Sequence, residues 1–224
     1  MCPVETELVI EIGPGRGALT DYLLARAKRV IAIEIDPVLV QYLRAKYRDD
    51  SRLELIESDV LKADLSAFGP TAVAGNLPYY ITSPIVEKVL ALRALLSRAV
   101  FLVQKEVAER MTTGPGSRDY GYLSVSTQFQ AEAELLFTVP PGAFRPPPKV
   151  DSAVVRLTAK PELAITDVQP FLKFVGYCFR HKRKTLRNNL LGVYPSEVLD
   201  ALPERGKRAE QMSIAELIDL FRRL

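Results

Sequence analysis

The sequence predicts a doubly wound α/β domain over residues 1–159, with a mostly parallel sheet, followed by a small all-helical domain over residues 160–224. Short apolar runs alternate with amphipathic segments up to about residue 105, and helical periodicity dominates after residue 160. The chain has 224 residues, which is longer than a typical domain. A larger domain with a small appendage is therefore expected.

The buried strands are predicted from short runs rich in Val, Ile and Leu, the composition of strands that are covered on both faces. These runs are residues 8–12, 30–35, 53–57, 72–75 and 99–103. The segments between them carry apolar residues at three- and four-residue spacing, which is typical of helices. Polar residues, Asp-Pro or Ser-Pro lie near their starts. The predicted helices are residues 18–28, 37–47 and 84–95.

Two further strands are expected at the edge of this sheet, after a helix over residues 122–130. Residues 135–139 and 150–157 are strand-like, and we expect them to pair as an antiparallel hairpin. The connection between them has the sequence PPGAFRPPP, which can form neither a helix nor a central strand. We therefore expect this connection to be a stiff exposed loop. The second domain is predicted to contain helices over residues 168–179, 182–190, 196–202 and 213–224.

The composition, with 48% hydrophobic and 25% charged residues, excludes a disordered or fibrous chain. No apolar run approaches the ~20 residues of a membrane span, and the start does not resemble a signal peptide. We expect a cytoplasmic protein with no membrane partner and, by default, a monomer. Cys2 and Cys178 are too few for a disulfide framework and have no metal-binding cluster around them, so reduced thiols and no metal are expected.

Positive charge is concentrated near the C-terminus, although the net charge is only +3. Residues 160–224 hold 12 Lys and Arg against 8 Asp and Glu. Near the start of the helix predicted at residue 182, the sequence RHKRKTLR (180–187) favours binding to phosphates. The alternative interpretation is a solvated helix face. The candidate RNA-binding residues are Arg180, Lys182, Arg183, Lys184 and Arg187. On a continuous helix, Arg183 and Arg187 would share one stripe.

A glycine-rich loop follows the first predicted strand. Gly13, Gly15 and Gly17 have the spacing G-x-G-x-G. Dinucleotide-binding enzymes use G-x-G-x-x-G, so this shorter spacing disfavours NAD and FAD. The glycines alone would also suit a tight strand-to-helix turn, but the carboxyl end of the first strand is where a doubly wound sheet binds its ligand.

Acidic residues follow the next two strands. Glu34 ends the second strand, where a carboxylate can bind both hydroxyls of a ribose, although it could instead cap the next helix. Asp59 follows the third strand and can accept from an adenine amine, although it could be an ordinary turn residue. Together with the glycine loop, these residues describe a pocket for an adenosine without a phosphate. S-adenosyl-L-methionine, with S-adenosyl-L-homocysteine as its product, is such a ligand.

The fourth predicted strand is followed by Asn76, Leu77, Pro78 and Tyr79. The Asn76 amide oxygen and the Leu77 carbonyl can accept the two hydrogens of an exocyclic amine and localise its lone pair for attack on a methyl group. Pro78 stiffens the turn, and the Tyr79 ring, without need of its hydroxyl, can stack on an extruded base. Asn76 is also expected at the edge of the cofactor site. A coincidental Asn-x-Pro turn is the alternative.

Five segments together resemble the KsgA/RsmA family, the small-subunit (16S) ribosomal RNA adenine dimethyltransferases. They are EIGPGRGALT (11–20), NLPYYITSP (76–84), QKEVAER (104–110), FRPPPKVDS (144–152) and KRKTLRNNL (182–190). The resemblance implies a class I, Rossmann-like methyltransferase domain and a helical RNA-positioning domain. It also implies dimethylation at N6 of two adjacent adenosines in the 3′-terminal hairpin loop of 16S rRNA, within an immature small subunit. Phe144 would flank the target base opposite Tyr79.

The chain differs from this family at its start. Family members carry a basic segment and a helix before the first strand, whereas only seven residues precede Leu8. We therefore expect an N-terminally shortened chain and leave the activity of such a chain open. Two alternatives remain at this stage: the related large-subunit methyltransferase that confers macrolide resistance, and a non-catalytic assembly factor that keeps the fold and the RNA surface.

Overall fold

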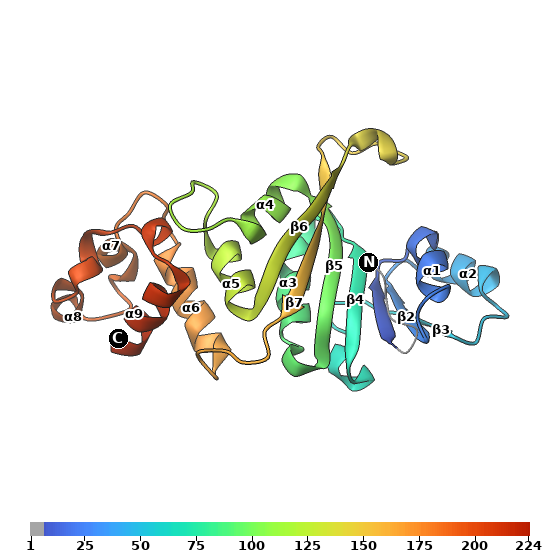
Figure 1. Cartoon of the computed structure of the whole chain (residues 1–224), viewed down its shortest axis with the longest axis horizontal. Helices are drawn as coiled ribbons and strands as arrows, with labels where there is room; N and C mark the ends of the chain where they lie inside the picture. Colours follow the sequence, from blue (N-terminus) through green and yellow to red (C-terminus); the bar gives the residue numbers. More distant parts are fainter. Residues whose placement is uncertain (1–6) are drawn as a thin grey trace. The chain divides into compact units, whose positions relative to one another are not determined.

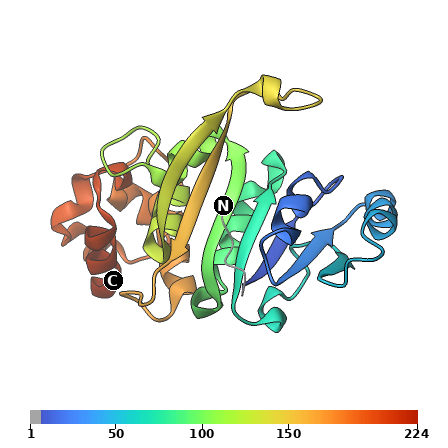
Figure 2. The same ribbon diagram turned by 45° about the vertical axis from the view of Figure 1, so that its right-hand side comes forward.

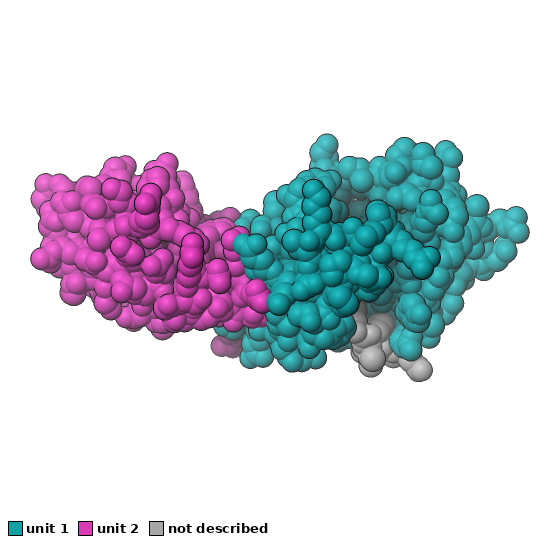
Figure 3. Space-filling model, turned by 90° about the horizontal axis from the view of Figure 1, so that it is seen from above, with its two compact units in different colours: residues 1–108, 131–161 teal, residues 109–130, 162–224 magenta. Residues whose placement is uncertain are grey.

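The computed structural model describes residues 7–224, and the chain divides into two compact units (Figure 3). The first unit comprises residues 1–108 and 131–161, and the second comprises residues 109–130 and 162–224. The expectations for Cys2 and for a segment preceding the first strand concern residues outside the described ones.

The first unit is built on one seven-stranded sheet (Figures 1 and 2). Its strand order is β3-β2-β1-β4-β5-β7-β6, with parallel pairing from β3 to β5 and antiparallel pairing of β7 with β5 and β6. This arrangement confirms the predicted mostly parallel sheet with an antiparallel edge hairpin. The strands are β1 (Leu8–Ile12), β2 (Arg29–Glu34), β3 (Leu53–Glu57), β4 (Thr71–Asn76), β5 (Leu96–Gln104), β6 (Ala131–Val139) and β7 (Ser152–Ala159).

The centre of this sheet is fully buried. Val9 on β1 lies opposite Val30 on β2 and Ala72 on β4, and none of the three side chains is exposed. The edge strand β6 begins four residues before its predicted start. Its first part alternates small apolar residues with the exposed Glu132 and Glu134, so it lacks the apolar run by which the inner strands are recognised.

Three helices of the first unit pack beside the parallel strands: α1 (Ala18–Leu24), α2 (Pro37–Lys46) and α3 (Thr82–Leu90). The Asp36 carboxylate caps α2 by accepting from the Val38 amide at 2.8 Å, and Pro37 occupies the first helical position. The connection between β6 and β7, which contains the proline-rich loop, projects beyond the ends of the strands (Figures 1 and 2). A further helix, α4 (Lys105–Thr112), follows β5 and was not predicted.

The second unit is helical. It contains α5 (Tyr122–Gln130), α6 (Val168–Cys178), α7 (Leu186–Leu190), α8 (Ser196–Asp200) and α9 (Ile214–Arg223). The structure groups residues 109–130 with the C-terminal helices, whereas the sequence placed them in the first domain. Aromatic packing explains the difference: the rings of Phe129 and Phe171 lie 4.6 Å apart, and those of Tyr120 and Phe179 lie 5.8 Å apart.

Helix α7 is shorter than predicted. The sequence indicated a helix over residues 182–190, but the helix begins at Leu186, and the Thr185 hydroxyl accepts from the Asn188 amide as its cap. Residues 179–184 form turns and bends. Arg183 therefore does not share a helical stripe with Arg187, and that expectation was wrong.

No helix within residues 7–224 is long and apolar enough to cross a membrane. Over the same residues, no group of three or more His, Cys, Asp or Glu side chains could hold a metal ion. Cys178 is buried, and burial raises the pKa of its thiol to about 12, so this thiol is a structural one.

Candidate active site

The glycine loop and the Asn76 segment meet at the point where the strand order reverses, because β1 and β4 are neighbours. Gly13, Gly15 and Gly17 all have positive φ angles, of 66°, 58° and 84°. A Cβ atom added to Gly13 would lie 3.9 Å from the Asn76 carbonyl oxygen, whereas one added to Gly15 would meet nothing within 4 Å. The loop is thus open at Gly15, where a ligand can approach the backbone.

Gly17 has a different environment. A Cβ atom there would lie 2.4 Å from the Tyr47 hydroxyl oxygen. That hydroxyl bonds to the Gly17 carbonyl and to the Asp21 carboxylate, and the Lys46 ammonium donates to Asp21 at 2.8 Å. These contacts lower the pKa of Asp21 and raise that of Lys46. The structure therefore explains Gly17 by packing between the start of α1 and the end of α2.

Glu34 lies at the carboxyl end of β2 and is only 7% exposed. One carboxylate oxygen accepts from the Gly15 amide at 3.2 Å, and the other accepts from the Ile35 and Asp36 amides at 2.9 and 3.1 Å. Asp36, and not Glu34, caps α2. Glu34 is thus held against the glycine loop, where the sequence placed a ribose-binding carboxylate.

Asp59 lies after β3 and is half-buried. One of its carboxylate oxygens accepts from the Leu61 amide at 2.9 Å, and its carbonyl accepts from the amides of Lys62 and Ala63. The residue therefore organises a turn, as the alternative interpretation expected. Its second carboxylate oxygen has no hydrogen-bond partner among residues 7–224.

Glu11 is a site feature that the sequence analysis missed. It is 1% exposed, lies on β1 next to the glycine loop, and accepts from the Thr20 hydroxyl at 2.6 Å. Burial is the main cause that raises the pKa of this carboxyl to about 7, and the nearby Asp21 and Glu34 add to the effect. A single acidic residue within the apolar strand LVIEI was the pattern that could have revealed it.

The Asn76–Tyr79 segment leaves the sheet at the end of β4. Asn76 is exposed, whereas the Leu77 side chain is buried, so Leu77 can serve a ligand only through its backbone. The Leu77 amide donates to the Leu102 carbonyl at 3.0 Å, and the Pro78 carbonyl accepts from the Thr82 hydroxyl at 3.1 Å. The turn is therefore fixed on both sides while the Asn76 side chain remains accessible.

The proline-rich loop completes this site. Phe144 and the segment 146–148 line one cavity together with the four residues from Asn76 to Tyr79, and its volume is about 350 Å³. Residues almost 70 positions apart in the chain are thereby brought together, as the sequence analysis expected. Such a volume is in the range of small-molecule sites.

The Tyr79 hydroxyl is engaged, contrary to the expectation that only the ring matters. It lies 3.0 Å from the Ser152 hydroxyl, and Ser152 is fully buried at the start of β7. This bond joins the turn after β4 to the strand that follows the proline-rich loop.

The predicted RNA-binding residues are only partly available. Arg180, Lys182, Arg183 and Lys184 are exposed, and Lys182 donates to the Arg118 carbonyl at 3.2 Å. Arg187 instead forms two hydrogen bonds with the Asp200 carboxylate, which hold the pKa of Asp200 below its usual value. Arg187 thus forms an ion pair with Asp200 at the surface of the second unit.

The backbone of this basic turn, residues 180–184, is held by a buried side chain. Asn189 is 3% exposed, and its amide group donates to the carbonyls of Cys178 and His181 at 2.8 and 3.2 Å. Its oxygen accepts from the His181 amide at 3.1 Å. No local pattern indicated this role, because an Asn inside a predicted helix normally faces solvent.

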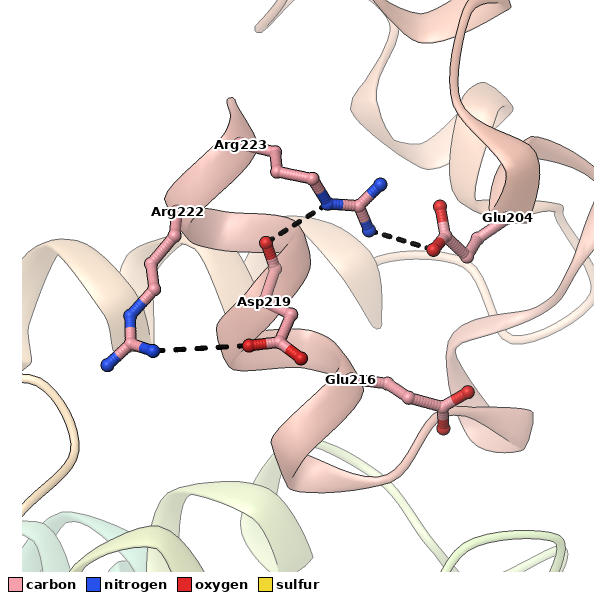
Figure 4. A pocket seen from close by; sticks show the side chains of 5 residues that line it. All are labelled: Glu204, Glu216, Asp219, Arg222 and Arg223. Atoms are coloured by element: carbon pink, nitrogen blue, oxygen red, sulfur yellow. Dashed lines mark hydrogen bonds and ion pairs between the residues drawn. The ribbon is translucent and has the colours of Figure 1, made fainter.

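A second charged cluster is formed by α9 and the preceding Glu204 (Figure 4). Arg223 pairs with Glu204 at 2.8 Å, and Arg222 lies 4.0 Å from Asp219 (Figure 4). Because three carboxylates surround its two arginines, this cluster offers no site for an anionic ligand.

The sheet order, the glycine loop after β1, the acidic residue at the end of β2 and the Asn76 turn after β4 define a class I methyltransferase. A family model described as "Ribosomal RNA adenine dimethylase" matches residues 2–224. The chain belongs to this family of enzymes. Ribosomal RNA small subunit methyltransferase A of Acidobacterium capsulatum is 46% identical, with coverage of 96% of this chain and 81% of the relative. The protein of the same name from Legionella pneumophila (strain Lens) is 43% identical, with coverage of 97% and 87%.

Solved structures agree with this assignment. A dimethyladenosine transferase from Plasmodium falciparum has a TM-score of 0.84 and 30% identity, covering 97% of this chain and 89% of its own. The 23S rRNA methyltransferase ErmE has a TM-score of 0.74 and 31% identity, covering 99% of this chain and 92% of its own.

Proposed function

We propose that this enzyme dimethylates N6 of two adjacent adenosines in the 3′-terminal hairpin loop of 16S rRNA, within an immature small ribosomal subunit in the cytoplasm. The observation that carries the proposal is the single cavity formed by Asn76–Tyr79 and Phe144 beside the glycine loop. An extruded adenine can enter between the Tyr79 and Phe144 rings, with its amine directed to Asn76.

S-adenosyl-L-methionine is the proposed cofactor, and it supplies an activated methyl group when bound. The residues present fit this cofactor. The backbone is open at Gly15, and Glu34 is buried beside that glycine. One carboxylate oxygen of Asp59 has no hydrogen-bond partner among residues 7–224. Glu34 would bind the ribose hydroxyls and Asp59 the adenine amine. Gly13 and Gly15 allow the close approach, and S-adenosyl-L-homocysteine would remain in the same contacts after transfer.

The chain's own residues would make the target amine nucleophilic. The Asn76 side-chain oxygen and the Leu77 carbonyl accept its two hydrogens, which turns the nitrogen lone pair away from the ring. Pro78 and the Thr82 bond fix the turn, and Tyr79 and Phe144 stack the base. The proton that is released on transfer passes to water, so no general base is assigned.

The basic turn would orient the rRNA by contacts with phosphates. Arg180, Lys182, Arg183 and Lys184 are exposed and suit this role, whereas Arg187 is withdrawn from it by Asp200. The small subunit is favoured over the large one because the relatives at 46% and 43% identity are both named Ribosomal RNA small subunit methyltransferase A.

A methyl-transfer assay on undermethylated small subunits tests the proposal. The wild-type chain should add four methyl groups per subunit, and Asn76→Ala should reduce single-turnover rates steeply while cofactor affinity changes little. A loss below about threefold would reject the role of Asn76. A wild-type chain that binds subunits but transfers no methyl group would instead support a non-catalytic assembly factor.

A further inference from the structure

A groove of about 840 Å³ lies on the second unit, outside the site described above. It runs along the solvent face of α6 and is bordered by α5. The residues that define it here are Tyr122, Gln169, Lys173, Gly176, Tyr177 and Arg180. Four of these recur at three- or four-residue spacing on α6, which places them on one stripe of the helix, and Arg180 follows two residues after the helix ends. The opposite stripe, with Phe171, Phe174 and Val175, is buried in the core.

The charge of the groove has one sign. Lys173 and Arg180 are exposed cations, and no Asp or Glu is among the residues that line it. The cluster on α9 is different, because three carboxylates surround its two arginines. The groove is therefore complementary to a polyanion, and the α9 cluster is not.

The aromatic residues of the groove provide a second kind of contact. Tyr122 and Tyr177 are only partly buried, with one side packed against the core of the second unit. A Cβ atom at Gly176 would lie 3.8 Å from the Tyr122 ring, so the glycine keeps the surface beside this ring free of a side chain. Partly exposed rings beside cations are typical of surfaces that bind unstacked nucleotides.

We propose that this groove binds a stretch of ribosomal RNA with at least one unstacked nucleotide. Lys173 lies about 7.5 Å along the helix from its last residue, Cys178, and Arg180 follows that end, so the two cations suit a backbone with repeating phosphates and not one phosphate group. Tyr177 lies on the same stripe as Lys173 and stacks on a base or sugar. Arg180 also begins the basic turn, so the groove continues that surface along α6. The inference rests on the proposed function, since it supplies a second contact for the same substrate.

Equilibrium binding to undermethylated small subunits over a range of KCl concentrations tests the proposal. Lys173→Gln should lower the slope of log affinity against log salt by roughly 0.7 to 0.9. Arg222→Gln, on α9, is the matched control and should leave the slope unchanged. Tyr177→Leu should weaken binding about fivefold or more, whereas Tyr177→Phe keeps the ring and should bind as the wild type does. Thermal unfolding of each variant shows that the fold is retained.

Two outcomes would overturn the groove assignment alone. The first is an unchanged salt slope in Lys173→Gln while the wild type still methylates subunits. The second is a slope change with whole subunits that is absent with protein-free 16S rRNA, because the groove would then contact a ribosomal protein. A wild-type chain that neither binds nor methylates subunits would reject the proposed function together with the groove.

Discussion

The hydroxyl groups of Tyr79 and Ser152 lie 3.0 Å apart, and this bond links the two walls of the candidate active site. Tyr79 belongs to the turn after β4, and Ser152 begins β7 directly after the proline-rich loop that carries Phe144. Because Ser152 is fully buried, its position is fixed by the sheet. The bond therefore ties the Tyr79 side chain to the strand that follows the proline-rich loop.

We predict that Tyr79→Phe and Ser152→Ala each lower the single-turnover methylation rate about twofold to tenfold. This range corresponds to the net free energy of one hydrogen bond. The double variant should lose no more than either single variant, since both remove the same interaction. Tyr79→Ala should lose more, because the ring is removed as well. Additive losses in the double variant would show that the two hydroxyls act separately.

Glu34→Ala should weaken the binding of S-adenosyl-L-homocysteine about tenfold to a hundredfold, because a hydrogen bond to a charged acceptor is worth roughly 1.5–3 kcal/mol. The loss of the acceptor for the Gly15 amide adds to this effect. Glu57→Ala is the matched control: Glu57 pairs with Glu34 in the register of β2 and β3 but is exposed. Calorimetry that gives both variants equal affinity would reject the ribose assignment.

The buried Glu11 should make stability dependent on pH. Its folded-state pKa of about 7 lies above the ordinary value of 4.5, so the folded state holds a proton that the unfolded state has lost between these values. Stability should therefore fall as pH rises from about 4.5 to 7, by about 3 kcal/mol in total, and this contribution should be constant at higher pH. Glu11→Gln imitates the protonated form and should flatten the dependence in urea unfolding. Parallel pH profiles for the two proteins would contradict this prediction.

Arg183 and Arg187 should behave differently although both are arginines of the same basic segment. Arg183→Gln should reduce the salt slope of subunit binding by nearly one unit, whereas Arg187→Gln should change it little because its guanidinium is held by Asp200. Asp200→Asn provides the complement: it frees Arg187 and should raise the slope. Equal slopes for Arg183→Gln and Arg187→Gln would show that the ion pair opens on binding.

Local sequence patterns were sufficient for the inner strands and for the residues that follow them. The apolar runs of β1 and β4 determine where Gly13 and Asn76 emerge, and adjacent parallel strands must bring those positions to one edge of the sheet. Phe144 could be placed only through the resemblance to a known family, because nothing local indicates that the proline-rich loop lies beside the turn after β4.

Contacts between distant residues account for what the sequence did not reveal. The grouping of residues 109–130 with the C-terminal helices was not anticipated, because the packing of Phe129 on Phe171 depends on tertiary structure alone. Helix α7 was predicted too long because the Asn189 side chain binds the backbone of the preceding turn. Helical periodicity in a sequence does not show such a bond between a side chain and the backbone outside its helix.

Asn189 also leads to a prediction that separates it from its neighbour. Asn189→Ala would leave the buried Cys178 carbonyl without its donor and would remove one of the two donors to the His181 carbonyl, which should cost about 2 kcal/mol or more of unfolding free energy. Asn188→Ala changes an exposed side chain and should stay within about 0.5 kcal/mol of the wild type. Because the basic turn is ordered by Asn189, its alanine variant should also bind small subunits more weakly at every salt concentration, with an unchanged number of cations and hence a nearly unchanged salt slope. Urea unfolding and subunit binding of the two variants test both statements, and an Asn189→Ala protein as stable as Asn188→Ala would remove Asn189 from this role.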